Sequence, residues 1–461
     1  MFNLLAWAEK FVATPSVSRD GNAAIARLAA DMLREIGLEP RLVPARHEGV
    51  EHFNLIADVP LSAHARERAG DGLILLTHLD TVPPGESEDW TATGGDPFQP
   101  TRDGDRLFGL GSADAKVDLV CKAAALAQTD WSRLRSPIRV VGTFGEEIGL
   151  VGARHFVTTG GAEGFRYALV GEPSELAGIR AHKGYAVFEA VIPLTPVHDG
   201  RPVHDGSLAI QELEIRGQTA HSSTPHLGRN AIDAALERLA QADTRSVHAL
   251  DAGTAVNVVP ARATLQIGLR ATQNSVASAS PTEPAKLGRG YDPTPLVDFH
   301  RAWRALLAQL AETRDADFDP AHTVGNLGRI ELRDDRCVIR FDLRPVPGVD
   351  AAEAVRPLER HAKLQLVRQN PPLNTAPNGA LVRAVQRAQS AAGLAPRILT
   401  KATCTEAGLL AQSGRLEVIV LGAGLSVGNV HRPNEHTRIS ELGGACNLYR
   451  ELIQMLCMEA A

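Results

Sequence analysis

Histidine and carboxylate side chains stand where three apolar runs of this sequence stop. His78 and Asp80 end the run "LILLTHLD", Glu146 and Glu147 end "RVVGTFGEE", and Glu172 closes "YALVGE". Imidazole and carboxylate groups can bind divalent metal ions and can transfer protons. If the fold brings these ends together, they form a polar site that suits metal ions.

Two further residues of the same kinds follow this pattern. Asp114 lies in the glycine-rich stretch "FGLGSADAKVD", and His431 lies in "NVHRPNEH", after the late apolar run "EVIVLGAG". Carboxylates crowded into one cleft repel each other strongly, and a pair of divalent cations would cancel that repulsion. Nitrogen and oxygen ligands without thiolates suit zinc, with cobalt or manganese as alternatives.

Each of these residues also has an ordinary structural explanation. His78 could be a strand-end histidine with ordinary hydrogen-bond partners, and Asp114 could cap a helix. Glu146 and Glu147 could stabilise a helix dipole, and Glu172 could be a turn residue before proline. The stretch "GLGSAD" lacks the third glycine of a dinucleotide loop, and no Gly-x-Ser-x-Gly nucleophile motif is present. Taken singly, the ordinary explanations are favoured. The occurrence of all these residues at successive strand ends favours a metal site.

The elements that must position these groups alternate between strand and helix. Short β-rich apolar runs are typical of strands buried on both faces of a parallel sheet, and ligands bind beyond the carboxyl ends of such strands. The sequence predicts strands over 72–80, 137–147, 167–174 and 415–424. It predicts helices over 22–38, 118–130 and 441–457. The fold class is therefore α/β with a mainly parallel sheet.

The middle of the chain has a different pattern. From residue 183 apolar and polar residues alternate, as in half-exposed antiparallel strands, with helices predicted over 230–241 and 350–362. We expect a discontinuous catalytic domain over 1–182 and 376–461, and an inserted α+β domain over 183–375. Two extra insertions are expected near 193–208 and 271–320. The first repeats Pro-Val-His-Asp-Gly and predicts a surface hairpin or loop, although its histidines could bind metal. The second contains a stretch rich in Ser, Pro and Gly, residues 274–295, which predicts a mobile loop, and then a predicted helix over 296–313.

Composition narrows the class of protein. A chain of 461 residues is long enough for two domains, and a net charge of −6 gives no basic surface for nucleic acid or a membrane. No apolar run approaches the ~20 residues that span a bilayer. Five scattered cysteines form no disulfide framework, and the first residues do not read as a signal peptide. We expect a cytoplasmic protein.

Seven blocks together resemble one known family, the dinuclear metallohydrolases that include acetylornithine deacetylase, succinyl-diaminopimelate desuccinylase, aminoacylase and glutamate carboxypeptidases. In order, these blocks are "HLDTVPP", "GLGSADAKVDL", "GEEIGLVGARHF", "VGEPSELAGIRAHKGY", "GQTAHSSTPHLGRNAID", "RFDLRPVPG" and "HRPNEH". The resemblance covers nearly the whole chain. "RAHKGY" and "CTEAG", residues 404–408, are most similar to the acetylornithine deacetylase branch.

The resemblance implies a role for each residue at the strand ends. Asp114 would bridge two metal ions, with His78 and Glu172 completing one site and Glu147 and His431 the other. Asp80 would accept a hydrogen bond from His78 and fix its tautomer. Glu146 would be the general base that takes a proton from a metal-activated water.

The resemblance also assigns roles within the inserted domain. His221 in "TAHSSTP" would stabilise the oxyanion of the tetrahedral intermediate, reaching across a homodimer, although a packed loop histidine is the ordinary alternative. The inserted domain would serve as dimerisation surface and lid.

The family's carboxylate-binding pair has two partial copies in this chain. The family carries an Asn and, thirteen residues later, an Arg that together hold the substrate carboxylate. Asn257 and Arg270 have that spacing, whereas Arg344 has the expected flanking residues but Glu331 replaces its Asn. Both arginines stay candidates, and either could instead be a strand residue paired with a carboxylate.

These observations predict a metal-dependent amidohydrolase acting on an N-acyl amino acid, with acetylornithine or a close relative as substrate. A dipeptidase or a succinyl-diaminopimelate desuccinylase on the same scaffold is the alternative among enzymes. A non-catalytic, metal-stabilised dimer that binds an amino acid is the alternative of another class. An intact Glu146 argues against it, because a binding module needs no general base.

Overall fold

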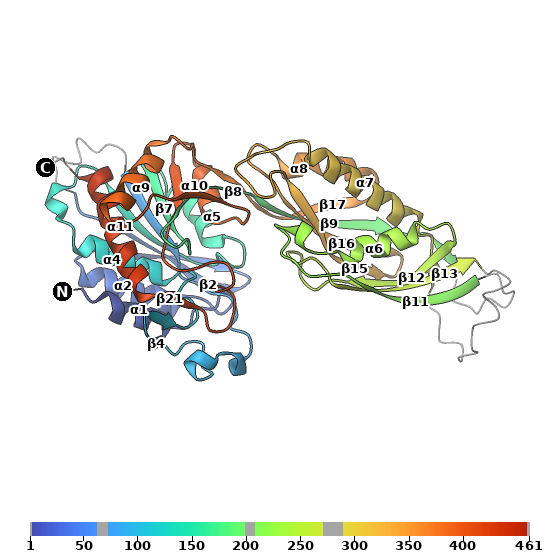
Figure 1. Ribbon diagram of the computed structural model, residues 1–461, viewed down its shortest axis with the longest axis horizontal. Coiled ribbons are helices and arrows are strands. Elements are labelled where there is room, and N and C mark those ends of the chain that lie inside the picture. The colour runs from blue at the N-terminus through green and yellow to red at the C-terminus, as the bar shows by residue number, and fades with distance from the viewer. Residues whose placement is uncertain (1, 62–71, 199–207, 271–288, 459–461) are drawn as a thin grey trace. The chain divides into compact units, whose positions relative to one another are not determined.

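A mixed sheet lies at the centre of the first of two units in the computed structural model (Figure 1). The structure describes residues 2–61, 72–198, 208–270 and 289–458. Unit 1 contains Met1–His182 and Leu373–Ala461, and unit 2 contains Lys183–Pro372. Most of the predicted histidine repeat and most of the Ser/Pro/Gly-rich stretch lie outside the described residues, at 199–207 and 271–288.

The strands of the main sheet in unit 1 are β1 (Arg41–His47), β2 (Val50–Asp58), β3 (Gly72–His78), β6 (Ile138–Thr143), β7 (Phe165–Gly171), β8 (Gly178–His182), β18 (Leu373–Asn374), β19 (Ile398–Lys401) and β20 (Glu417–Val420). Their order is β1-β2-β6-β3-β7-β20-β8-β18, with β19 beside β8. The four central strands β6, β3, β7 and β20 are parallel neighbours, and most of the outer pairings are antiparallel. The α/β class is therefore confirmed, and the carboxyl ends of these four strands meet at one edge.

The helices of unit 1 are α1 (Leu4–Val12), α2 (Ala23–Glu35), α4 (Val117–Ala127), α5 (Val151–Thr158), α9 (Ala380–Ala391), α10 (Ala407–Ala411) and α11 (Ile439–Cys457). A small second sheet contains β4 (Thr101–Asp103), β5 (Arg106–Phe108) and β21 (His436–Arg438).

The central strand β3 explains why the sheet is covered on both faces. Leu73 and Leu75 pack into one core with α1, α2, α4, α9 and α11. Ile74 and Leu76 point the other way, into a second core with α5 and α10. Successive side chains of a strand alternate between faces, so a strand buried on both faces is mostly apolar. The two polar residues of this strand, Thr77 and His78, stand at its end, and His78 is placed at the sheet edge.

Unit 2 is built on an antiparallel sheet. Its strands are β9 (Tyr185–Pro193), β10 (Pro196–His198), β11 (Leu208–Arg216), β12 (Thr244–Ala252), β13 (Arg262–Arg270), β14 (Gly290–Tyr291), β15 (Val324–Arg333), β16 (Arg336–Arg344) and β17 (Lys363–Asn370). The order is β10-β14-β12-β15-β16-β9-β17, and β13 joins β11 to β12. This matches the predicted alternating pattern.

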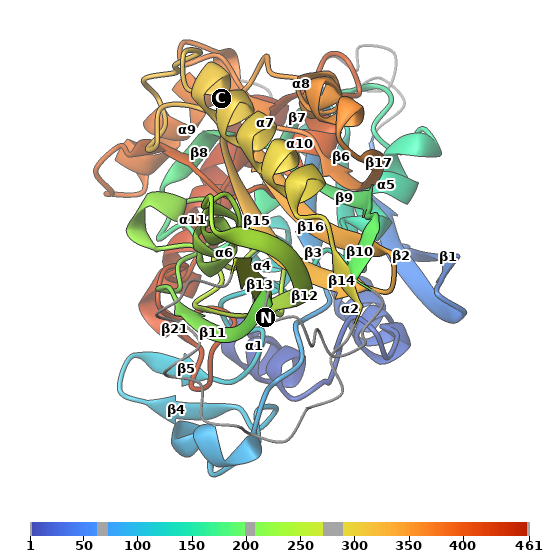
Figure 2. The same ribbon diagram turned by 90° about the vertical axis from the view of Figure 1, so that its right-hand side faces the viewer.

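Helices α6 (Ala231–Leu239) and α7 (Thr294–Leu310) pack against one face of this sheet (Figure 2). The predicted helix over 350–362 is wrong in its length. Helical structure there consists of α8 (Ala351–Ala354) and a short 3₁₀ turn at Arg356–Arg360. Pro357 supplies no N–H donor and disfavours the α conformation of the residue before it, which explains the interruption.

Candidate metal centre

Asp114 lies between two histidines, one on each of its carboxylate oxygens. Its Oδ1 is 3.3 Å from Nε2 of His78, and its Oδ2 is 3.0 Å from Nε2 of His431. Asp114 stands in the loop that leads from β5 into α4, so its position follows from the start of that helix. A carboxylate that faces two separate groups in this way has the geometry of a bridging ligand.

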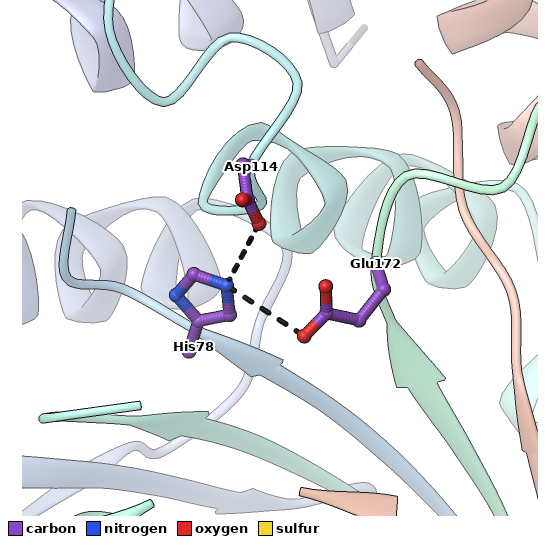
Figure 3. Close-up of side chains that lie close together, drawn as sticks. All are labelled: His78, Asp114 and Glu172. Carbon is purple, nitrogen blue, oxygen red and sulfur yellow. Dashed lines mark hydrogen bonds and ion pairs between the residues drawn. The ribbon is translucent and has the colours of Figure 1, made fainter. Parts of the chain in front are cut away.

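The first group contains His78, Asp114 and Glu172 (Figure 3). His78 ends β3, and Glu172 directly follows β7, its parallel neighbour. Nε2 of His78 is 3.9 Å from Oε1 of Glu172. All three residues are buried, at 1%, 8% and 8% exposure.

The second group contains Asp114, Glu147 and His431. Glu147 lies in the turn after β6, and Nε2 of His431 is 2.9 Å from its Oε1. His431 stands in the loop between β20 and β21, with a positive φ of 59° that non-glycine residues seldom adopt. Its side chain is 48% exposed, so this group is the more open of the two.

The charges of the two groups shift the pKa of each member. Burial and the Asp114 charge raise the pKa of Glu172 to about 8. Burial disfavours the imidazolium of His431, yet the Asp114 and Glu147 carboxylates raise its pKa to about 11. Burial likewise opposes the imidazolium of His78, and the carboxylates around it raise its pKa well above the usual value. Without metal ions, protons compensate the charge of this cluster.

The donor set and its spacing fit two divalent cations. The ligand atoms of each group all lie within 4.8 Å of one another. Two ligand atoms on one tetrahedral zinc ion are about 3.3–3.6 Å apart, because zinc–ligand bonds are about 2.0–2.2 Å long. The first group already has separations of 3.3 and 3.9 Å, and the second, at 2.9 and 3.0 Å, would open by a few tenths of an ångström.

Glu146 and Asp80 lie beside the two groups. Burial and the charges of Glu147 and Glu172 raise the pKa of Glu146 well above its usual value. Asp80 accepts hydrogen bonds from the backbone N–H groups of Glu146 and Glu147, at 3.1 and 3.3 Å. Nδ1 of His78 is 3.1 Å from the backbone carbonyl of Asp80 and 3.7 Å from its carboxylate. Asp80 thus orients His78 mainly through its backbone, while its side chain holds the turn that carries both glutamates.

Glu435 is a supporting residue that the sequence did not identify as part of the site. Its Oε1 accepts N–H bonds from Gly111, Ala113 and Asp114, at 3.0, 2.9 and 3.0 Å, and its side chain is buried. Its backbone carbonyl accepts a further bond from Gly109. Glu435 follows His431 by four residues, so it joins the loop of one candidate ligand to the loop of another. The motif "HRPNEH", which contains both residues, is the sequence feature that could have indicated this role.

A buried polar cluster beneath the sheet edge was also missed. Lys122 donates to Asp118 at 2.8 Å, to Thr77 at 2.7 Å and to the Leu76 carbonyl. The Tyr449 hydroxyl donates to the other Asp118 oxygen at 2.6 Å. All four polar side chains are 5% exposed or less. This cluster ties α4 and α11 to the end of β3 and so fixes the strand end that carries His78.

His221 belongs to unit 2, where it is exposed in the loop before α6. The backbone N–H of Ser223 donates to its Nδ1 at 3.1 Å. A ring nitrogen that accepts a hydrogen bond carries no hydrogen, so the neutral imidazole has its N–H on Nε2. In this tautomer His221 can donate a hydrogen bond from its Nε2–H group.

The residues considered for carboxylate binding differ in their surroundings. Asn257 is exposed in the turn between β12 and β13. Arg270 ends β13, and its side chain lies outside the described part of the structure. Arg344 ends β16 and is only 4% exposed. Glu331 lies on β15 and accepts from Arg329 and Arg333, so it is part of an ion-pair cluster on the strand.

Arg344 has an acidic, a hydroxyl and an aromatic neighbour within unit 2. Its Nε is 3.4 Å from Oδ2 of Asp342, and its Nη2 donates to the Ser222 hydroxyl at 3.0 Å. The guanidinium also lies 3.8 Å from the ring centre of Tyr185, a cation–π contact. Burial raises the pKa of Asp342 to about 6, while Arg344 and Ser222 oppose that rise. These contacts fit a structural arginine.

Curated relatives match about half of the chain. Acetylornithine deacetylase from Yersinia pseudotuberculosis serotype O:1b (strain IP 31758) is 31% identical over 239 residues, which are 50% of this chain and 53% of that protein. The enzyme of the same name from Photorhabdus laumondii is 33% identical over 230 residues, 49% of this chain and 50% of that protein. The chain thus spans about half the length of the curated relatives it matches.

Solved structures show the same fold over the whole chain. Aminoacylhistidine dipeptidase from Vibrio alginolyticus superposes with a TM-score of 0.71 at 17% identity, covering 99% of this chain and 97% of that one. Human carnosine dipeptidase 1 superposes with a TM-score of 0.58 at 14% identity, covering 97% of this chain and 95% of that one. A protein of Bacillus subtilis described as a dinuclear metal binding peptidase gives 0.51 at 13% identity, covering 98% and 97%.

The sequence model described as Peptidase family M20/M25/M40 matches residues 74–455. That span runs from β3 to α11 and includes both candidate metal groups. Among the described residues, no helix is long and apolar enough to cross a membrane. The resemblance read from the seven sequence blocks is confirmed, and the chain belongs to the peptidase family M20/M25/M40.

Proposed function

We propose that this protein is a metal-dependent hydrolase of the amide bond in N-acyl amino acids, with acetylornithine or a close relative as substrate. The observation that carries the proposal is Asp114, whose two oxygens face His78 and His431 separately. Neither the helix-cap nor the turn explanation requires two imidazoles and two further carboxylates around one aspartate. Paired cations would neutralise this set.

The residues fit two divalent cations, and zinc is our choice, with cobalt or manganese as alternatives. Asp114 would bridge them, His78 and Glu172 would complete one site, and Glu147 and His431 the other. Bound divalent ions lower the pKa of water toward ~7 and polarise the scissile carbonyl. Glu435 and Asp80 would hold the ligand loops in place through the N–H bonds described above.

Glu146 would act as the general base and then as the general acid. It is adjacent to Glu147, and Asp80 holds the backbone of both residues. Its raised pKa favours a carboxyl that can take a proton from the attacking water and release it to the leaving amine. The His221 imidazole, with its N–H on Nε2, would donate to the oxyanion of the tetrahedral intermediate.

The substrate class rests on the named relatives and on the chemistry of the site. The curated relatives carry the name acetylornithine deacetylase, which supports an N-acyl amino acid. Asn257 and Arg270 have the family spacing for holding the substrate carboxylate, and we favour Arg270 over the already paired Arg344. A cytoplasmic homodimer formed through unit 2 remains a prediction.

A dipeptidase is the second candidate. The observation in its favour is the TM-score of 0.71 to aminoacylhistidine dipeptidase over 99% of this chain. The same candidate residues would serve both reactions, because each cleaves one amide bond beside a carboxylate. A panel of N-acetylornithine, N-acetylcitrulline, N-succinyl-diaminopimelate and dipeptides, assayed with zinc and with cobalt, separates the two.

The assignment of Glu146 is tested by Glu146→Gln. We expect kcat to fall by about 10²–10⁴-fold, the usual contribution of a general base, with unchanged metal content. Glu86→Gln, at an exposed position before the first 3₁₀ turn, is the control and should retain full activity. Parental turnover by the Glu146 variant would contradict the assignment, and an inactive parent protein would favour a binding module.

His221→Ala separates catalysis from metal binding. We expect kcat to fall by about 10²–10³-fold, as for the loss of one oxyanion donor, while metal content stays the same. An unchanged rate would instead assign His221 to local packing around Ser223.

A further inference from the structure

Unit 2 contains a pocket that the proposed hydrolysis does not use. Its cavity volume is about 470 Å³, within the ~300–1,000 Å³ typical of small-molecule sites. The walls come from the 3₁₀ turn Pro225–Leu227, from the end of α7, and from the loop between α7 and β15. That loop falls partly in the segment that the sequence marked as an insertion.

The pocket combines an apolar wall with charged and polar groups. Phe318 is 5% exposed, and Leu307 and Val324 lie beside it. Arg314 and Asp319 line the same pocket on the connecting loop, and both are exposed. An apolar wall with a few convergent polar groups is the usual construction of a ligand site.

The two charged groups of this pocket do not pair with each other in the described part of the chain. The carboxylate of Asp319 faces the ammonium of Lys183 and opposes the fall in its pKa, and the guanidinium of Arg314 lies near His322. Two opposite charges on one pocket that do not pair with each other match a molecule carrying both charges.

Two imidazoles add polar groups to the wall. His226 and His322 both line the pocket, and Nδ1 of His322 is buried without a partner among the described residues. Burial, with the nearby charges of Lys183 and Arg314, lowers the pKa of His322, so its imidazole is neutral near pH 7. A neutral imidazole can donate one hydrogen bond and accept another. A buried polar atom without a partner carries a free-energy cost that a bound ligand would relieve.

We infer that this pocket binds a free α-amino acid with a medium-sized apolar side chain. The ligand's carboxylate would pair with Arg314, its ammonium with Asp319, and its side chain would pack against Phe318 and Leu307. A simple carboxylate or a simple amine would leave one of the two charges unsatisfied. Hydrolysis of an N-acyl amino acid would release a free α-amino acid, and that link alone rests on the proposed function. Acetylornithine itself would release ornithine, whose side chain is cationic, so the apolar ligand of this pocket would differ from that product.

Calorimetric titration of the full-length, metal-loaded protein tests this site with L-leucine and L-phenylalanine as probes. We expect one binding event per chain. L-leucinamide, which lacks the carboxylate, and 4-methylpentanoate, which lacks the ammonium, should each bind at least tenfold more weakly than L-leucine. Equal binding of all three compounds, or no binding of either amino acid, would overturn the inference.

Variants separate the pocket from the metal centre. Arg314→Gln and Asp319→Asn, both at exposed loop positions, should each weaken L-leucine binding at least tenfold. Arg301→Gln, an exposed arginine on α7 that pairs with Asp298, is the matched control and should bind as the parent does. His78→Ala should also retain binding. Loss of binding in His78→Ala with retention in both pocket variants would place the amino acid at the metal centre and would overturn the proposal, whether or not the protein hydrolyses amides.

Discussion

The metal centre of unit 1 and the Arg344 cluster of unit 2 are both buried, charged and close to strand ends, yet their charges are balanced differently. Around Arg344, one guanidinium faces one carboxylate, with the Ser222 hydroxyl between them. Around Asp114, several carboxylates face two imidazoles, and the pKa values of Glu172 and His431 are both raised. The first cluster sets one cation against one anion, although Oδ1 of Asp342 has no hydrogen-bond partner among the described residues. The second has an excess of carboxylates, which divalent cations would neutralise.

This difference bears on which of the two clusters requires metal ions. A buried ion pair sets one cation against one anion and needs no counter-ion. A buried cluster of like charges requires a counter-ion, and groups with strongly shifted pKa values gather at functional sites. The sequence left Arg344 as a candidate for substrate binding or for a strand residue paired with a carboxylate, and its contact with Asp342, two residues earlier on the same strand, supports the second interpretation.

The largest effect is expected for Asp114→Asn. An amide cannot replace a bridging carboxylate, so both metal ions should be lost and kcat/KM should fall by about 10³-fold or more. Metal analysis and kinetics on the purified variant measure both quantities. Asp103→Asn, at an exposed position in β4, is the control. Retention of both ions in the Asp114 variant would show that the two groups do not share this ligand.

Arg344→Leu should act mainly on stability. The change leaves Asp342 buried without its cation, so the free energy of unfolding should fall by about 3–5 kcal/mol in a denaturant titration. Arg340→Leu removes an exposed arginine from the same strand, paired with Glu189, and should cost less than about 1 kcal/mol. A raised KM with parental stability would instead make Arg344 the arginine that binds the substrate carboxylate.

Glu435→Ala sharpens the account of how the ligand loops are held. Removing the acceptor of three N–H groups should weaken zinc binding by about 10–100-fold, as for other residues that orient metal ligands. Competition with a chelator measures that affinity. Glu441→Ala is matched to it, since Glu441 accepts one N–H, from Gly424, and its loss should have little effect. Equal zinc affinities of the two variants would mean that Glu435 stabilises only the fold of the loop and does not orient the metal ligands.

The remaining prediction concerns pH. In the metal-free protein, pKa values of about 11 for His431 and about 8 for Glu172 leave both groups protonated near neutrality. Metal binding must release these protons, so zinc affinity should rise with pH, about tenfold per pH unit for each proton released. Affinity measured between pH 6 and 7.5 gives the slope. A flat dependence would mean that the ligands are deprotonated before metal binds.

Much of the fold and the positions of the candidate ligands could be predicted from the sequence. The strand ending at His78 is apolar from Leu73 to Leu76 because it is buried on both faces, and that pattern is readable without coordinates. The parallel order of β6, β3 and β7 then places Glu147, His78 and Glu172 at one edge. His431 followed from its place after the last apolar run.

The supporting residues could not be predicted in the same way. Glu435 acts on backbone N–H groups more than 320 positions away in the chain, and no local pattern marks that contact. Lys122 and Asp118 read as residues of an ordinary helix, although both are buried beneath the sheet edge. The pocket around Arg314 depends on a loop of irregular composition, for which periodicity gives no information.

The most direct test of the central claim is a zinc titration of metal-stripped protein, followed by metal analysis of the saturated sample. If Asp114 joins two ligand groups, the protein should bind two zinc ions per chain, and hydrolysis of N-acyl amino acids should return as both sites fill. Binding of no zinc, or full hydrolytic activity in thoroughly metal-free protein, would contradict the account.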